Sequence, residues 1–172
     1  MGRAYDMLLA TTEDVTLELN RARQKDEMQQ LEKKWNMTLA KPGRILVREG
    51  NLTKVSRKSN IRYTFVLFND MLMYGSDTGT SAQLHRMLDL SHMQIAALPD
   101  RRNAFQILAE KSFVVVASDA EERDAWFREI QAQLDRLGSD PEAQRLAAVW
   151  KQDSAATKCH LCTNTFNVVR RR

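Results

Sequence analysis

The stretch from residue 44 to residue 117 carries a series of short strand patterns with no helical pattern between them. The strand patterns are separated by turn signals such as Asn69-Asp70. Such short connections join neighbouring strands when these run antiparallel, because parallel strands need a long crossover. We therefore predict an antiparallel sandwich or small barrel. Its seven strands are expected at residues 45–56, 62–68, 71–74, 83–90, 92–97, 104–109 and 112–117.

An amphipathic helix is predicted directly after the last strand. Ser118 and Glu121 have the S-x-x-E spacing of a capping box, which satisfies two free backbone N–H groups at a helix start. Gly138 suits the position just past the end of this helix. We expect Trp126 to anchor the helix over the open end of the barrel. The apolar stripe of the helix is Trp126, Phe127, Ile130, Leu134 and Leu137.

A long helix is predicted before the sheet, from residue 4 to about residue 39. Gly and Pro are absent between Arg3 and Lys41, and Pro42-Gly43 is expected to end the helix. The apolar stripe shifts phase near residues 24–27, which argues against a sustained coiled coil. We expect this helix to be an appendage that contributes nothing to the core of the sheet. Its apolar residues form two groups, first Leu8, Val15, Leu19 and Ala22, then Met28, Leu31 and Trp35.

The composition allows one core and excludes several classes of protein. A chain of 172 residues with 43% hydrophobic residues suits one domain with extensions. No apolar run approaches the ~18 residues that a membrane-spanning helix needs. Two cysteines cannot form a disulfide framework, so we expect a reducing, cytosolic compartment. No phosphate-binding Gly-rich loop, nucleophile elbow or His pair at helical spacing is present, so we expect no catalytic residues and no enzyme.

The net charge of +4 is unevenly distributed along the chain. Residues 41–62 contain many basic side chains but only one acid, Glu49. A basic lobe on a near-neutral body indicates an anionic surface as partner. Nucleic acid is not expected, because no aromatic-basic pattern or nucleic-acid motif accompanies the charges. The basic residues of this lobe are Lys41, Arg44, Arg48, Lys54, Arg57, Lys58 and Arg62.

Cys159 and Cys162 have the spacing of a zinc half-site. A structural zinc site needs four ligands, and His160 lies inside the loop between the two cysteines, where it cannot easily supply a third. We therefore interpret the pair as an incomplete half-site that binds no cofactor in this chain. A thioredoxin-type redox pair is a less favoured alternative, because no βαβ pattern surrounds the cysteines.

A seven-stranded antiparallel sheet followed by one amphipathic helix with a tryptophan is the layout of a pleckstrin-homology (PH) domain. Residues 42–50 and 67–72 resemble the start and the second turn of PH domains in two groups of proteins. These are the FGD-like Rho exchange factors and the phafin-like PH–FYVE adaptors. The resemblance implies an α+β, mainly β fold, with a PH barrel or sandwich in residues 41–138.

The C-terminal segment, residues 139–172, resembles a linker and the opening of a FYVE zinc finger. Trp150 and Asp153 precede the cysteine pair, and Arg170, Arg171 and Arg172 follow it. In the FYVE family such arginines begin a stretch that binds an endosomal phosphoinositide. The His-His-Cys that should follow is missing here. The resemblance implies a finger remnant, in which zinc is expected only if the finger is intact.

The N-terminal helix distinguishes the two groups. Residues 13–23, followed by Glu27 and Leu31, resemble the last helix of a Dbl-homology (DH) exchange domain, which runs directly into a PH domain. Phafin-like proteins have only a short segment there, so we favour an exchange-factor parent and assign residues 1–40 to the end of a DH-like domain. The exchange surface of a DH domain lies mainly in earlier helices. This chain is therefore expected not to exchange nucleotide.

The loop between the first two strands is the candidate lipid site, with Lys54, Arg57, Lys58 and Arg62. Lysine supplies a point charge and arginine a bidentate fork for phosphate. The family pattern has a lysine late in strand one, which Lys54 matches, and two basic positions early in strand two. Counting back from residues 67–70 places Ile61 and Tyr63 at those two positions, and only a bulge would bring Arg62 to the same face. The opposite lip, residues 75–81, has no Lys or Arg.

Two functions follow from the resemblance. The first is a membrane-targeting and regulatory PH module of a Rho-GEF-like signalling protein that binds phosphoinositide or anionic membrane weakly. The alternative is a scaffold module that contacts a small GTPase or the neighbouring DH domain without specific lipid binding. The expected partners are a membrane surface and, through the parent protein, a Rho-family GTPase. The expected location is cytoplasmic, peripheral at endosomal or plasma membrane.

Overall fold

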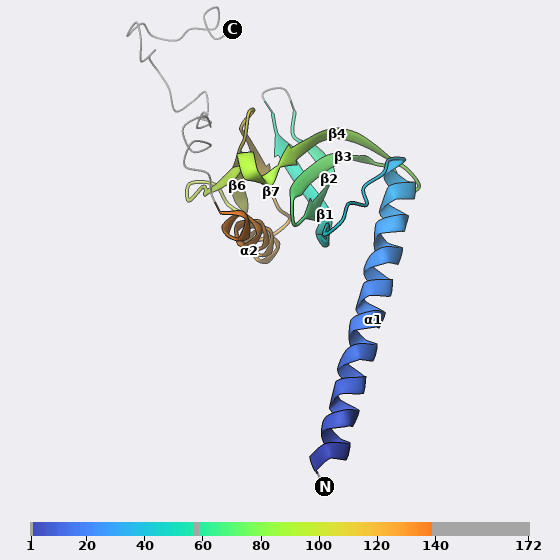
Figure 1. Ribbon diagram of the computed structural model, residues 1–172. Helices are drawn as coiled ribbons and strands as arrows, with labels where there is room; N and C mark the ends of the chain where they lie inside the picture. Colours follow the sequence, from blue (N-terminus) through green and yellow to red (C-terminus); the bar gives the residue numbers. More distant parts are fainter. Residues whose placement is uncertain (1, 57–58, 139–172) are drawn as a thin grey trace, which may run out of the picture.

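A computed structural model describes the main chain of residues 2–56 and 59–138, and the side chains of residue 16 and of residues 18–56 and 59–138. Two helices flank one seven-stranded antiparallel sheet with the strand order β4-β3-β2-β1-β7-β6-β5 (Figure 1). This confirms the fold predicted from the sequence. In chain order the elements are α1 Gly2–Trp35, β1 Leu46–Val55, β2 Ile61–Phe68, β3 Met71–Asp77, β4 Ala82–Asp89, the 3₁₀ turn η1 Leu90–His92, β5 Gln94–Ala97, β6 Ala104–Leu108, β7 Phe113–Val116 and α2 Ala120–Leu137.

The strands lie close to their predicted positions, with two differences. Strand β3 continues to Asp77, so the first half of the loop expected at residues 75–81 is paired with β4. Strand β5 starts later than expected because residues 90–92 form the 3₁₀ turn η1. Asp89 caps this turn, since its carboxylate accepts a hydrogen bond from the backbone N–H of Ser91 at 2.9 Å.

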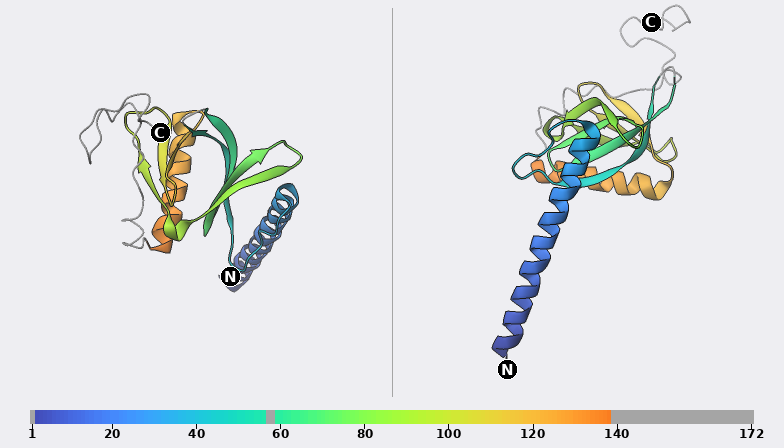
Figure 2. Two further views of the ribbon diagram at one scale, coloured as in Figure 1. Left: turned by 90° about the horizontal axis from the view of Figure 1, so that it is seen from above. Right: turned by 90° about the vertical axis from the view of Figure 1, so that its right-hand side faces the viewer.

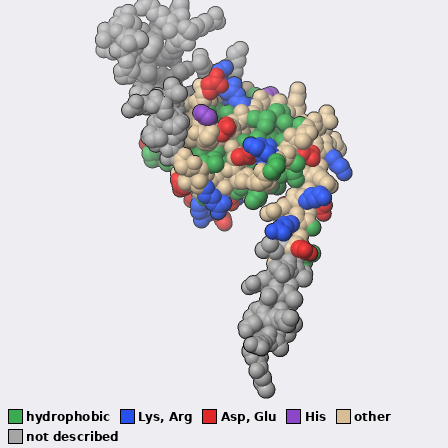
Figure 3. Space-filling view, viewed as in Figure 1, with side chains coloured by type: hydrophobic (Ala, Val, Ile, Leu, Met, Phe, Trp, Pro, Cys, Tyr) green, Lys and Arg blue, Asp and Glu red, His purple; other side chains and the backbone are tan. Residues whose placement is uncertain are grey.

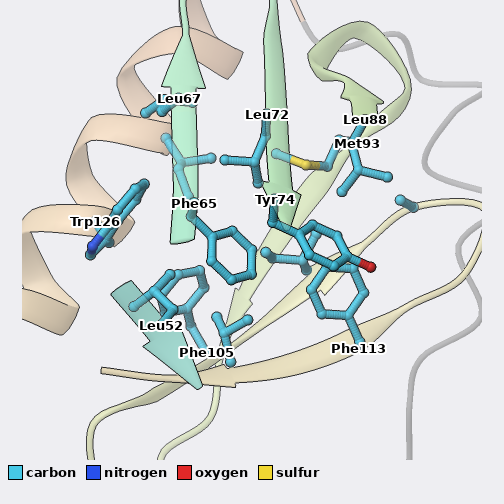
Figure 4. Packing of buried hydrophobic residues seen from close by; sticks show 14 of the residues in the cluster. Leu52, Phe65, Leu67, Leu72, Tyr74, Leu88, Met93, Phe105, Phe113 and Trp126 are labelled. Atoms are coloured by element: carbon cyan, nitrogen blue, oxygen red, sulfur yellow. The ribbon is translucent and has the colours of Figure 1, made fainter. Parts of the chain in front are cut away.

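The main core lies on the inner face of the curled sheet, and helix α2 packs against it. Trp126 is fully buried and stands edge-on to Phe65, with the ring centroids 6.4 Å apart (Figure 4). A Cβ added at Gly50 would come within 3.3 Å of the Trp126 ring, so β1 and α2 approach each other closely here. Trp126 therefore anchors the helix, as predicted. The prediction for Leu137 is wrong, because its side chain is 45% exposed.

Helix α2 begins one residue later than the capping box at Ser118 and Glu121 predicted. Asp119 is the N-cap, and its carboxylate accepts a hydrogen bond from the backbone N–H of Glu122 at 2.7 Å. The Glu122 carboxylate in turn accepts from the backbone N–H of Ser118 at 3.0 Å. The pKa of Asp119 lies below its ordinary value, because the carboxylate accepts these hydrogen bonds. The bond from the Glu122 N–H has the largest effect, and the bond from the Ser118 hydroxyl has the next largest. The cap is therefore Asp119 and not the predicted Ser118, and the negative charge of Asp119 also suits the helix N-terminus.

Helix α1 ends at Trp35, before the predicted end near residue 39. Asn36 adopts a left-handed conformation with φ of 48°. The N–H of Met37 bonds back to the carbonyl of Glu32 at 3.2 Å, and the N–H of Asn36 bonds to Lys33, which together form a Schellman ending. Asparagine tolerates this conformation better than most side chains. The helix therefore stops at an asparagine that the sequence pattern did not mark.

The last turns of α1 are part of a second core on the outer face of strands β2 and β3. Trp35 and Leu31 are 3% and 4% exposed, and Leu39 in the following segment is fully buried. The expectation that the whole helix is an appendage is therefore wrong for these turns. The earlier turns do project away from the sheet (Figures 1 and 2), and Leu19 is 66% exposed. The buried residues of this outer cluster are Met28, Leu31, Trp35, Leu39, Val66, Phe68, Met71 and Met73.

The contact between α1 and the sheet requires Gly75 in β3. A Cβ at this position would lie 2.8 Å from the Trp35 ring and 2.0 Å from the backbone oxygen of Gln83. Both distances are shorter than any real contact of a Cβ atom, so only glycine fits between the helix and strand β4. Strands β2 and β3 are consequently covered on both faces, which explains the unbroken burial of residues 64–68 and of residues 71–75.

Polar contacts fix the same end of α1. The Lys34 ammonium lies 2.8 Å from a Glu49 carboxylate oxygen and 2.7 Å from an Asp77 carboxylate oxygen, so it joins the helix to β1 and β3. The Glu32 carboxylate accepts hydrogen bonds from the backbone N–H groups of Leu39 and Ala40, each at 2.7 Å.

None of the helices in the described part of the chain has the length and apolar character needed to cross a bilayer.

Candidate functional site

Lys54 lies near the end of β1 with its side chain on the inner face of the sheet. Its ammonium donates a hydrogen bond to the Tyr74 hydroxyl at 2.7 Å. The same nitrogen lies 4.8 Å from the centre of the Tyr74 ring and 4.5 Å from the centre of the Phe113 ring. Figure 4 shows these two rings side by side at the edge of the core. Lys54 is thus half-buried and already engaged by a hydroxyl and two aromatic faces.

The pairing of β1 with β2 decides which side chains can join Lys54. Lys54 stands opposite Ile61, Thr53 opposite Arg62 and Leu52 opposite Tyr63. The pairing is regular from Arg48 onward, and the irregularity between Leu46 and Arg48 is too far away to change it. Because opposite residues share a face and neighbours alternate, Arg62 points away from Lys54. No bulge restores the basic pattern, and the structure does not bring these two cations together.

An aromatic group occupies the place where the second strand of related folds carries basic side chains. The Tyr63 ring packs against Tyr74 and His85, with centroids 5.4 Å and 4.7 Å away. His85 Nε2 lies 3.1 Å from the Ser76 hydroxyl. Counting back along the second strand placed Tyr63 at this position, whereas no motif in the sequence marked His85. Tyr63 shares a face with the inward-facing Phe65 two residues further on, as strand alternation requires.

The other described residues of the basic lobe do not form one surface. Arg44 makes two hydrogen bonds to Asp70, at 2.8 Å and 2.6 Å, and a third to the carbonyl of Leu39. Arg48 pairs with Glu129 on α2 at 2.8 Å. Figure 3 shows Lys and Arg side chains scattered among acidic and apolar ones on the face in view. The described basic residues of residues 41–62 are therefore spread over the fold and partly neutralised.

The turn between β3 and β4 is acidic at its base. Asp77 accepts hydrogen bonds from the Lys34 ammonium and from the backbone N–H of Gly79. Burial is the largest influence and would raise the pKa of Asp77, but these hydrogen bonds outweigh it and hold the pKa below its ordinary value. The Asp77 carboxylate is thus paired with Lys34 of α1, and residues 75–81 contain no Lys or Arg that could bind a phosphate group from this lip.

The other predicted site residues lie outside the described part of the chain. These are Arg57 and Lys58 in the β1–β2 loop, the cysteine pair Cys159 and Cys162, and the arginines Arg170, Arg171 and Arg172. Among the described residues, no group of three or more His, Cys, Asp or Glu side chains could hold a metal ion.

The chain is similar in sequence to known proteins. A family model described as the PH domain matches residues 46–135. The human pleckstrin homology domain-containing family F member 1 is 38% identical over 145 residues, covering 78% of this chain and 52% of the relative. The mouse FYVE, RhoGEF and PH domain-containing protein 6 is 30% identical over 158 residues, covering 78% of this chain and 11% of the relative. The chain thus spans about half the length of the family F relatives, and far less of the exchange factor.

Two solved structures illustrate the similarity in fold. The DH/PH fragment of PDZRHOGEF, solved in complex with human RhoA, matches with a TM-score of 0.62 at 15% identity. That match covers 78% of this chain and 45% of the solved chain. An activated truncation of Vav1 matches with a TM-score of 0.57 at 16% identity, covering 67% of this chain and 33% of the other. At these identities the likeness concerns the fold alone.

Proposed function

Because this chain belongs to the PH domain family, we propose that its folded part is a non-enzymatic targeting module that binds anionic membrane weakly, through exposed cations. The observation that supports this most directly is the regular pairing of β1 with β2, which turns Lys54 and Arg62 to opposite faces. Weak attraction to a charged surface needs only exposed basic groups, each contributing about 1 kcal/mol near an anionic leaflet. Arg62 is exposed and has this freedom, whereas Lys54 is engaged within the fold.

A pocket specific for one inositol phosphate requires more than this site provides. Several cations must converge on the phosphate groups in fixed positions, and bidentate arginines give most of the geometric selectivity. In the described residues of this site, Lys54 is the one cation on the inner face, and Tyr63 and Ile61 stand where further cations would be needed. We therefore propose a peripheral role at endosomal or plasma membrane with little selectivity among phosphoinositide isomers.

Two charge variants test the proposal, because Arg62 is exposed on the outer face of the sheet whereas Lys54 is half-buried on its inner face. Arg62→Glu reverses an exposed charge and is expected to weaken binding to anionic vesicles about 30-fold, since two charge units correspond to about 2 kcal/mol. Lys54→Gln removes a charge that is half-buried against Tyr74 and is expected to weaken binding less than about fivefold. The opposite order of effects would indicate a pocket built around Lys54 and would refute the proposal.

A control variant shows whether the attraction is localised. Arg136→Glu changes the net charge by the same amount but lies exposed on helix α2. It is expected to weaken vesicle binding less than Arg62→Glu does. An equal loss would mean that net charge alone drives binding and that the outer face of β1 and β2 has no special part in it.

A second candidate function is that of a scaffold within a Rho-GEF-like parent protein. The observation that favours it is the fixed end of α1, where Trp35 is buried and Lys34 bridges Glu49 and Asp77. A helix held this firmly would set the orientation of any domain that precedes it. On this proposal the module contacts the neighbouring domain or a Rho-family GTPase and acts without specific lipid binding.

We also propose that the C-terminal segment carries the opening part of a FYVE-type finger. Cys159 and Cys162 provide two of the four ligands that a structural zinc needs. The arginines Arg170, Arg171 and Arg172 would add basic charge near a membrane without forming a lipid pocket alone. Zinc would be held only where two further ligands come from elsewhere.

A further inference from the structure

Strand β4, Ala82–Asp89, forms one edge of the sheet and carries exposed side chains. It pairs with β3 alone, because it is the terminal strand of the order β4-β3-β2-β1-β7-β6-β5 (Figure 1). Within the described part of the chain, the backbone groups on its other side therefore have no strand partner. Gln83, His85 and Met87 of this strand are exposed. An edge of this kind can accept an extended segment of another chain as an additional strand.

A bulge in β4 places two basic side chains next to each other on the inner face. Arg86 stands opposite Tyr74 of β3, whereas Leu84 stands opposite the very next residue of β3. His85 is therefore the extra residue of the bulge. Its ring lies against Tyr63, with the centroids 4.7 Å apart. Arg86 lies on the same face, because it is opposite the inward-facing Tyr74.

The positive charge of Arg86 is available to a partner. Among the described side chains, no carboxylate lies within ion-pair distance of its guanidinium group. The acid of the same strand, Asp89, is opposite Met71 of the outer cluster and therefore lies on the outer face. Its carboxylate accepts hydrogen bonds from the N–H and the hydroxyl of Ser91. The inner side of this edge is consequently basic.

The outer side of the same edge is apolar. Met87 is 43% exposed and stands opposite Met73, a buried member of the outer cluster around Trp35. Leu84 is partly buried against the same cluster. A further strand beside β4 would extend this apolar face and would bury Met87.

We propose that the edge of β4 binds an extended segment of another protein in which acidic and apolar residues alternate. Successive side chains of a strand point to opposite faces. The acidic residues of the segment would therefore meet His85 and Arg86, while the apolar residues would meet Leu84 and Met87. Main-chain hydrogen bonds would supply the affinity, and the two faces would select the sequence.

The charges disfavour a second copy of this chain as the occupant. An antiparallel β4 pair centred on Met87 would place the Arg86 side chains of the two copies diagonally across from each other, about 7–8 Å apart. A pair centred on Arg86 would place them directly opposite. Like charges in these positions destabilise strand pairing, and charged side chains on an edge prevent pairing between identical edges. Strands β3 and β2 separate this edge from β1, so the inference is independent of how the module binds lipid.

Fluorescence anisotropy of a labelled peptide tests the proposal with the full chain. The probe is a short peptide in which glutamate and valine alternate, and the control peptide has lysine in place of each glutamate. We expect the chain to bind the glutamate peptide and to bind the lysine peptide about tenfold more weakly or less. Methylation of the backbone nitrogens is then applied to each of the two alternating sets of peptide residues. It should abolish binding for the set whose N–H groups point at β4 and change it little for the other set.

Variants of the chain locate the contact. Arg86→Glu should weaken binding of the glutamate peptide about tenfold, and Arg86→Gln about threefold. Arg128→Glu makes the same change of charge at an exposed position of α2 and should alter binding less than about twofold. The peptide should also shift the NMR signals of the backbone amides of residues 82–89. If circular dichroism shows that Arg86→Glu disturbs the fold, Arg86→Gln and the methylated peptides still decide the question.

Three results would overturn the proposal. The first is no binding of the glutamate peptide at about 1 mM. The second is binding that survives both methylated peptides, or that Arg128→Glu weakens as much as Arg86→Glu does, because charge attraction alone would then explain it. The third is a dimer of the unchanged chain in sedimentation that the peptide dissociates, because a second copy would then be the occupant of the edge.

Discussion

Replacing Trp35 by alanine tests whether the end of helix α1 belongs to the folded core. A tryptophan side chain buries about 150–250 Å², which corresponds to about 4–6 kcal/mol at 25 cal/mol per Å². Alanine keeps a small part of that area and the site collapses partly, so we expect a loss of about 3–5 kcal/mol. A domain of this kind has a total stability of about 5–15 kcal/mol. The variant should therefore lose a large part of its stability.

Urea unfolding followed by circular dichroism measures this loss. With a slope of about 2 kcal/mol per M, the unfolding midpoint should fall by about 1.5–2.5 M. Leu19→Ala is the control, because this residue lies on the same helix but is 66% exposed, and it should change stability by less than about 0.5 kcal/mol. Trp35→Phe keeps an aromatic ring and removes a buried N–H that has no partner, so it should cost less than half as much. If Trp35→Ala costs no more than Leu19→Ala, the helix is an appendage and the packing argument fails.

Three further predictions concern charge, metal and exchange activity. Lys34→Met should lower stability by about 1 kcal/mol at neutral pH, because it removes the bridge to Asp77 and Glu49. The folded pKa of Asp77 is below its ordinary value. The contribution to stability is therefore complete at pH values above the ordinary pKa and should be lost as the pH falls from there through the lowered folded pKa. An unchanged stability difference between Lys34→Met and the unchanged chain at low pH would contradict the assignment. The 172-residue chain should not retain stoichiometric zinc as a monomer in the presence of a chelator, which metal analysis with mass measurement of the bound species can check. Adding the chain to a Rho-family GTPase should not accelerate nucleotide release, and acceleration in a fluorescent-nucleotide assay would show that α1 carries part of an exchange surface.

Much of the sheet could be predicted from local patterns, because turn signals and β-branched runs mark strands directly. The two-residue connection at Asn69 and Asp70 is one example, since it joins β2 and β3 as expected. The packing of α1 could not be predicted in the same way. A stripe of Met28, Leu31 and Trp35 fits equally well against a preceding domain or against the sheet, and the sequence does not say which partner covers it. Gly75 gave no sign of this packing either, because the sequence pattern assigned it to a loop; only its place in β3 shows the close approach of α1.

The candidate site was predictable only in part. Lys54 could be placed from its position late in the first strand, and the opposite orientation of Arg62 followed from counting back along the second. The engagement of Lys54 by Tyr74 and Phe113 could not be predicted, because those residues lie on β3 and β7 and meet only through the curl of the sheet. The neutralisation of Arg44 and Arg48 by distant acids was hidden for the same reason.

Vesicle binding measured at matched surface charge tests the central claim most directly. The full chain is titrated with vesicles that carry different phosphoinositide isomers, or phosphatidylserine in charge-equivalent amount. Each titration is repeated from low to physiological salt. We predict weak binding that differs little among these lipids and falls several-fold as the screening length shrinks from about 30 Å at 0.01 M to about 8 Å at 0.15 M. Tight binding to one isomer that resists physiological salt would contradict the account and would place a specific phosphate pocket at Lys54.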